Sequence, residues 1–244
     1  MNEANAPTPP VLPGPRRDAA ARVPLGTDPA ERAPITGLVG VVEAVLRQPR
    51  RVMFQLRQPG SGPLSTILVM IALACGLIYG LVVGTFSGGT QLWAAPVKVA
   101  GGLLLSALIC LPSLYIFSCL EGARARLTEV VGLVSGALAL TTVLLIGFAP
   151  VAWVFSQSTE SVAAMGGLHL VFGAIAAYFG LRFLNAAYAH LEPKSSGGLK
   201  VWMLIFILVA LQMTTALRPL VGQAETFLPT EKRFFVTHWA QCLK

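Results

Sequence analysis

The chain has 244 residues, of which 55% are hydrophobic and only 12% are charged, and its mean hydropathy is +0.69. Soluble domains average about 45–50% apolar and about 25% charged residues, so this composition excludes an ordinary soluble enzyme. The formal charge of +7 comes from 18 Lys and Arg against 11 Asp and Glu. This is a shortage of acids rather than an excess of bases, so we expect no nucleic acid among the partners. The composition predicts an all-α, polytopic membrane protein.

Two segments precede the first apolar stretch. Residues 1–34 are rich in Pro and Ala and have too little apolar surface to offset the entropy of ordering, so we expect a disordered, Pro-rich cytoplasmic tail. A polyproline ligand for a partner is the alternative interpretation. Residues 35–58 place Leu38, Val42 and Val45 at helical spacing and predict an amphipathic basic juxtamembrane segment, broken at Pro49. Its arginines are expected to contact anionic lipid headgroups. These headgroup candidates are Arg47, Arg50, Arg51 and Arg57.

Five apolar stretches follow, each close to the ~20 residues that cross a ~30 Å hydrocarbon core. They cover about 64–86, 96–119, 130–155, 162–184 and 200–217. The sequence therefore predicts a five-helix transmembrane bundle over 64–217. Residues 218–244 are expected to form a short extracytoplasmic tail with an amphipathic helix that starts near Thr230.

Lys and Arg residues near the span ends predict the orientation. Nine of them fall on the side of the N-terminus and four on the other side. The positive-inside rule then predicts a cytoplasmic N-terminus and a C-terminus outside. The high Ala, Gly, Arg and Pro content points to a bacterial source, and hence to the inner membrane.

Glycines recur every fourth position in the first span and, more weakly, in the third. Such a stripe lets another helix approach closely. Packing against a span of the same chain is the default interpretation, and contact with a partner protein or a second copy is the alternative. The helix-packing candidates are Gly76, Gly80, Gly84, Gly132 and Gly136.

Polar side chains at membrane depth are candidates for a transport pathway. Lys98 lies near the outer end of the second span, where we expect its ammonium group to snorkel to water; an inward-facing lysine is the alternative. Gln212, Thr215 and Arg218 lie near the end of the fifth span, where interhelical hydrogen bonds are the default interpretation. His169 has no carboxylate in any predicted span to act as its partner, so an interfacial or satisfied histidine is expected.

Sequence motifs for catalysis are missing. The chain has no phosphate-binding G-x-x-x-x-G-K-[ST], no H-E-x-x-H, no G-x-S-x-G and no clustered carboxylates in a predicted span. Its four cysteines show no C-x-x-C spacing. We therefore expect no enzyme activity, no cofactor and no metal site.

Three strings resemble the Yip family (Ypt/Rab-interacting membrane proteins) in its bacterial form. They are LRQPRRVMFQL before the first span, APVKVAGGLLLSALICLPSLYIFSCLEG through the second, and ALRPLVG after the fifth. The resemblance covers roughly 45–220 and implies an integral membrane protein without catalytic residues. Eukaryotic Yip relatives bind small GTPases or each other in vesicle traffic, and the sequence lacks the features that would carry this activity over.

The leading hypothesis is a non-enzymatic protein that organises the membrane by binding lipid, a membrane-protein partner or a second copy. A small permease or transporter subunit, with Lys98, Gln212, Thr215 and Arg218 along its pathway, is the alternative. A membrane-embedded enzyme is the remote third hypothesis.

Overall fold

The structure is a computed structural model of the chain, and it describes residues 23–217. Within this range it contains α-helices, one short 3-10 turn and no strand. The helices are α1 (Pro29–Arg32), α2 (Gly37–Arg47), α3 (Pro49–Leu56), α4 (Gly62–Ser87), α5 (Gln91–Leu120), α6 (Leu127–Ser158), α7 (Val162–Tyr188) and α8 (Gly197–Ala216), and the 3-10 turn is η1 (Ala189–Leu191).

The helices α4 to α8 are each long and apolar enough to cross a membrane. They confirm the predicted all-α fold with five spans. Exposed large hydrophobic side chains line the outside of the bundle, among them Leu108 on α5, Tyr178 on α7 and Leu204 on α8. Such extensive exposed apolar surface is typical of helices that face lipid.

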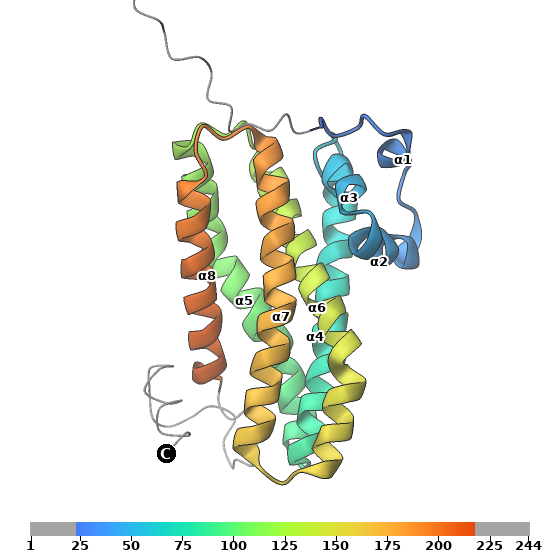
Figure 1. Cartoon of the computed structure of the whole chain (residues 1–244), viewed down its shortest axis with the longest axis vertical. Helices are drawn as coiled ribbons and strands as arrows, with labels where there is room; N and C mark the ends of the chain where they lie inside the picture. The colour runs from blue at the N-terminus through green and yellow to red at the C-terminus, as the bar shows by residue number, and fades with distance from the viewer. Residues whose placement is uncertain (1–22, 218–244) are drawn as a thin grey trace, which may run out of the picture.

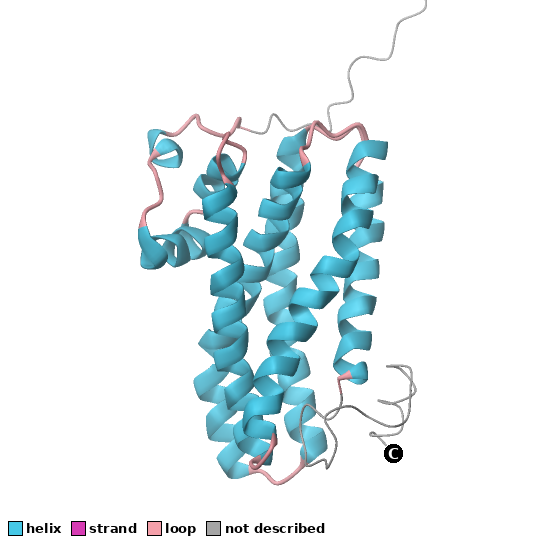
Figure 2. Cartoon of the chain, turned by 180° about the vertical axis from the view of Figure 1, so that it is seen from behind, coloured by secondary structure: helices cyan, strands magenta, loops and turns pink. Residues whose placement is uncertain are grey.

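The main contacts between the long helices follow the order α7, α6, α4, α5, α8. Helix α4 packs against both α6 and α5, α7 packs against α6, and α8 packs against α5 (Figure 1). The three short helices lie beside the end of the bundle where α4 begins, and α2 runs across the direction of the long helices (Figures 1 and 2). The α5–α6 and α7–α8 connections lie at this same end (Figure 1), which we call the basic end.

The turn at the opposite end explains where α5 begins. Gly88 and Gly89 have φ of 65° and 53°, a left-handed conformation that glycine adopts without a steric cost. The chain therefore reverses quickly, and α5 begins at Gln91 rather than near residue 96. Pro96 therefore lies in the second turn of α5, where its missing N–H removes one backbone hydrogen bond.

The interior contains two apolar clusters. The larger one lies toward the basic end and includes Leu56, Leu68, Leu114 and Trp202, none more than 1% exposed. The smaller one lies toward the opposite end, where the Phe148 and Phe172 rings stack with centroids 4.7 Å apart. The bundle core thus consists of two clusters of packed apolar side chains, one toward each end.

The indole of Trp202 joins α8 to α5 beside Pro112. Its Nε1 donates to the Cys110 carbonyl at 2.7 Å, and the Ser113 hydroxyl donates to the same carbonyl at 2.7 Å. Pro112 has no N–H to donate to the carbonyl four residues before it, so α5 lacks one backbone hydrogen bond in this turn. The bond from Trp202 to the neighbouring Cys110 carbonyl fixes α8 to the same part of α5.

The N-terminal region differs from the predicted tail. Residues 23–34, expected to be disordered, include α1 and pack against α3. The prediction is wrong for this part, because polar contacts rather than apolar burial hold the segment. The remainder of the predicted tail, the predicted helix near Thr230 and Arg218 lie outside the described residues.

Candidate functional site

The segment 23–36, which we call the strap, folds over α3 at the basic end. Asp28 caps α1 by accepting from the Ala30 N–H at 2.9 Å. One oxygen of the Glu31 carboxylate accepts from the Gly26 N–H at 2.5 Å, and the other accepts from the Arg50 guanidinium on α3. Glu31 is only 7% exposed. The strap therefore places a buried carboxylate against the Arg50 guanidinium.

Arg50 and Arg51, which we call the arginine pair, bind the strap with several donors. Arg50 also donates to the carbonyls of Val23 and Pro24, at 3.2 and 3.1 Å. Arg51 donates to the carbonyls of Ala33 and Pro34, at 2.9 and 2.8 Å. Two of the four predicted headgroup arginines thus hydrogen-bond to the strap in this structure.

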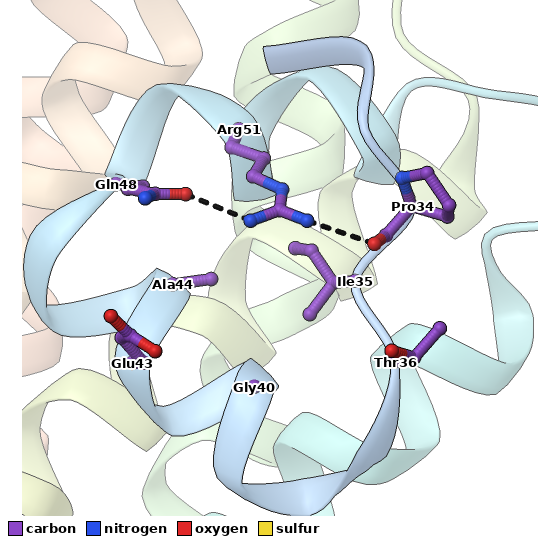
Figure 3. A pocket seen from close by; sticks show the side chains of 8 residues that line it. All are labelled: Pro34, Ile35, Thr36, Gly40, Glu43, Ala44, Gln48 and Arg51. Atoms are coloured by element: carbon purple, nitrogen blue, oxygen red, sulfur yellow. Dashed lines mark hydrogen bonds between the residues drawn. The ribbon is translucent and has the colours of Figure 1, made fainter. Parts of the chain in front are cut away.

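The strap and α2 enclose a small depression beside Arg51. Its volume is about 130 Å³, and its lining includes Ile35, Gly40 and Gln48. Arg51 lies between the Gln48 side chain, to which it donates at 2.9 Å, and the Pro34 carbonyl (Figure 3). The guanidinium is fixed by acceptors on two sides.

The other two predicted headgroup arginines are arranged differently. Arg47 forms an i,i+4 ion pair with Glu43 at 3.4 Å, with side chains 77% and 55% exposed, and such an exposed pair contributes little stability. Arg57 is half-buried and makes no side-chain hydrogen bond or ion pair within residues 23–217. Both remain within reach of groups outside the bundle.

Helix α2 has three distinct faces. Val41, Ala44 and Val45 are buried against the bundle. Leu38 and Val39, 61% and 78% exposed, belong to an apolar face that no described residue covers. Glu43 and Arg47 form a polar face beside it. A helix with an uncovered apolar face and adjacent bases is typical of an element that lies in the membrane interface.

Hydrogen bonding sets the acidity of Glu31. The bond from Arg50 lowers the pKa of this carboxyl below its ordinary value of 4.5; desolvation opposes this effect, and the Gly26 N–H adds to it. His190 has a smaller lowering effect through its charge. The carboxylate is therefore ionised at neutral pH.

The predicted packing glycines lie at contacts between helices of this chain. A Cβ at Gly80 would lie 2.5 Å from the Pro96 Cα, and one at Gly84 would lie 2.6 Å from the Gln91 carbonyl oxygen. Gly76 faces Ala100 with 3.2 Å available to a Cβ. Helix α5 therefore occupies the glycine stripe on α4. This face is not accessible to a partner protein or a second copy.

The two glycines of the third span serve other contacts. A Cβ at Gly132 would meet Leu56 of α3 at 2.9 Å, and one at Gly136 would meet Phe183 of α7 at 2.8 Å. Gly180 of α7 approaches α6 more closely still, because a Cβ there would lie 2.1 Å from the Thr141 hydroxyl. The close approach of α6 and α7 therefore depends on glycine from both helices.

The predicted pathway residues lie where α5 meets the end of α8. Lys98 is 2% exposed, which corrects the expectation that it snorkels and favours the inward-facing alternative. Thr215 is also 2% exposed, and Leu217 lies 2.8 Å from a Cβ placed at Gly102, one turn from Lys98. Gln212 is half-buried. The end of α8 thus lies against α5 within one turn of Lys98, while Arg218 is outside the described residues.

Glu121, at the end of α5, is a site residue that sequence reasoning missed. Its carboxylate accepts from the Tyr188 hydroxyl at 2.7 Å, the Ser195 hydroxyl at 3.0 Å and the Gly198 N–H at 2.6 Å. It therefore ties the end of α7 and the start of α8 to α5. No local pattern marks it, since its partners are 67 to 77 residues away in the sequence.

His169 bridges α7 to α4 in the opposite half of the bundle. Its Nδ1 lies 2.8 Å from the Tyr79 hydroxyl. Nε2 is buried without a hydrogen-bond partner among the described residues. This places His169 in a bundle contact.

Comparison with known protein families, with curated proteins and with solved structures finds no match to this chain. The resemblance to the Yip family therefore stays a prediction, and the class established by the structure is an all-helical membrane protein with five apolar spans.

Proposed function

We propose that this chain is a non-enzymatic integral membrane protein that organises the membrane by contact with lipid and with membrane-protein partners, as the Yip resemblance implies. The proposal rests on its surface rather than on an internal cavity. The glycine stripe of α4 is filled by α5, so contacts with other molecules must use the outer faces of the bundle or the short helices.

The observation that carries the proposal is the construction of α2. This helix is fixed to the bundle through Val41, Ala44 and Val45, yet it leaves the apolar face of Leu38 and Val39 uncovered. It runs across the spans at the basic end (Figure 1). If α2 served only to pack against the bundle, its outward face would not require apolar side chains such as Leu38 and Val39.

The test is mild purification into lipid nanodiscs, followed by mass spectrometry of the lipids and proteins that accompany the chain. We expect selective enrichment of a lipid class or a stoichiometric partner, and loss of that enrichment in Val39→Asp. Val162→Asp is the control, because Val162 is an exposed valine as well but begins α7 at the opposite end. Bulk lipid alone, with no difference between the two variants, would overturn the proposal.

We further propose a bacterial inner-membrane location with a cytoplasmic N-terminus. The support is the charge distribution: the α2–α3 arginines and the bases of the α5–α6 and α7–α8 connections lie at one end of the bundle. The positive-inside rule assigns that end to the cytoplasm.

Lys98 supports a small permease as the second candidate function. A lysine buried between spans is costly and is commonly part of an ion or substrate pathway. A water-soluble thiol reagent should label cysteines placed at Gln212 and Thr215 if a wet pathway exists there. Protection of both positions, with labelling of a cysteine at exposed Glu160 as the control, would exclude this candidate.

A further inference from the structure

The arginine pair and the strap form a polar contact with few apolar supports. The acceptors are one carboxylate and four backbone carbonyls, all supplied by residues 23–34. Leu25 and Ile35 pack at the edge of the core, Gly26 lies against the Phe54 ring, and the Gln55 side chain exchanges hydrogen bonds with Ala33 and Ile35. Most other strap side chains are exposed. A lipid phosphodiester has the same single negative charge as Glu31 and could replace this carboxylate at the arginine pair.

A phosphodiester could accept the same hydrogen bonds from the arginine pair as these acceptors do. Arginine presents a planar fork of N–H donors that matches the oxygens of a carboxylate or a phosphate. In this structure Glu31 supplies the negative charge, and the carbonyls supply neutral oxygens around it. A lipid phosphate would offer the same donors two charge-bearing oxygens in one group.

Access and location both favour a lipid headgroup. Arg50 is 40% exposed at its side chain and lines an open depression of about 400 Å³ together with Val23 and Asp28. Helix α2, whose apolar face of Leu38 and Val39 is uncovered, packs against α3, which carries the arginine pair. The arginine pair is therefore positioned beside the surface that would contact the acyl and headgroup boundary.

We propose that the arginine pair is a binding site for anionic phospholipid headgroups and that the strap is its internal competitor. Glu31 occupies the site in the absence of such lipid. Anionic lipid displaces the strap and frees residues 23–34 from α3. This inference rests on the proposed function, because it names the lipid class and the regulation of the same membrane-facing region.

The experiment measures strap mobility with a spin label at Ala30→Cys, an exposed position of α1, after the native cysteines have been replaced by serine. The chain is placed in nanodiscs of phosphatidylcholine alone and in nanodiscs that also contain phosphatidylglycerol. We expect an immobile label in the first and a mobile label in the second. Equal mobility in both would overturn the proposal.

Charge variants test the competition. Glu31→Gln should mobilise the strap in both lipids and raise the retention of phosphatidylglycerol, measured by mass spectrometry, by about fivefold for each arginine released. Glu160→Gln is the matched control: it makes the same change of net charge at an exposed position of the α6–α7 connection, at the opposite end of the bundle, and should leave the label immobile in phosphatidylcholine. Equal retention by the two variants would contradict the proposal.

Two further arms separate the sources of phosphate and the two proposals. Inorganic phosphate added to phosphatidylcholine nanodiscs should leave the strap in place; mobilisation as strong as that by phosphatidylglycerol would overturn the assignment to lipid. Combined Arg50→Gln and Arg51→Gln should give a mobile strap without lipid enrichment.

The results also distinguish the two proposals. If the wild-type chain selects phosphatidylglycerol while the strap never responds, the inference fails and the proposed function stands. If the strap responds but Val39→Asp changes no enrichment, the carrying observation of the proposed function fails instead.

Discussion

Single residues decide how closely the spans approach, and Gly80 is the clearest case. A Cβ there would lie within 2.5 to 3.0 Å of backbone atoms of Ala95 and Pro96. Backbone cannot move aside as a flexible side chain can, so any larger residue must separate α4 from α5.

Gly80→Leu is expected to destabilise the bundle by about 1–3 kcal/mol or more, the usual cost of overpacking. The measurement is the midpoint of thermal unfolding in nanodiscs. Gly101→Leu is the control, since a Cβ at Gly101 meets nothing within 4 Å. Equal midpoints for the two variants would refute the packing role of Gly80.

Glu121 concentrates three hydrogen bonds on one buried side chain. Removing it leaves the Tyr188 hydroxyl, the Ser195 hydroxyl and the Gly198 N–H without this acceptor. Of these three donors only the Tyr188 hydroxyl is buried, since Ser195 is exposed and Gly198 is half-buried. An unsatisfied buried donor costs about 1–3 kcal/mol.

Glu121→Ala should therefore lower the free energy of unfolding by at least about 1–3 kcal/mol, and Glu121→Gln, which keeps one acceptor oxygen, should lose less. Thermal unfolding of both variants in nanodiscs checks the order. Glu160→Ala removes an exposed carboxylate from the α6–α7 connection and should have little effect. A Glu121→Ala protein as stable as this control would show that the three contacts contribute nothing.

At the level of elements, the strap is held by a contact that depends on ionised Glu31. The pKa of this carboxyl is lowered in the folded state, mainly by the hydrogen bond from Arg50. A lowered pKa means that the contact contributes fully above the ordinary value of 4.5 and is lost as the pH falls through the lower, folded-state pKa.

The strap should accordingly detach from α3 in acid, below about pH 4.5, while the spans stay folded. The Arg50 guanidinium and, more weakly, the charge of His190 lower the pKa of the Glu31 carboxyl, so detachment requires acid below the ordinary range of this group. The spin label at position 30, in phosphatidylcholine nanodiscs, reports the change as increased mobility. Glu31→Gln should show the mobile spectrum at every pH. A wild-type spectrum that stays unchanged into strong acid would show that strap attachment does not depend on ionised Glu31.

Sequence patterns predicted the long helices and not the strap, for a physical reason. Each span is a continuous apolar stretch, and the break at Pro49 follows from proline itself, which starts α3. The bond between Glu31 and Arg50 joins positions 19 residues apart, in a segment whose composition resembles disorder. Likewise, the burial of Lys98 depends on where α8 ends against α5, which no local pattern specifies.

The whole molecule offers a direct check of orientation. Arg124→Cys lies in the α5–α6 connection at the basic end, and Glu160→Cys lies in the α6–α7 connection at the opposite end; both positions are exposed. In intact bacterial cells, a membrane-impermeant thiol reagent should label the second and spare the first, in a chain whose native cysteines are replaced by serine. Labelling of Arg124→Cys alone would reverse the proposed topology.

The order of contacts between the long helices also has a consequence for assembly during synthesis. The principal neighbour of α8 is α5, and α4, α5, α6 and α7 contact one another without it. Because the chain emerges from its N-terminal side, the first four spans can complete their contacts before α8 enters the membrane. The hydrogen bond from Trp202 to the Cys110 carbonyl and the closing of the Glu121 contacts around Gly198 are then the last steps of maturation, and a nascent chain that stops before α8 leaves one flank of α5 open to quality-control proteases.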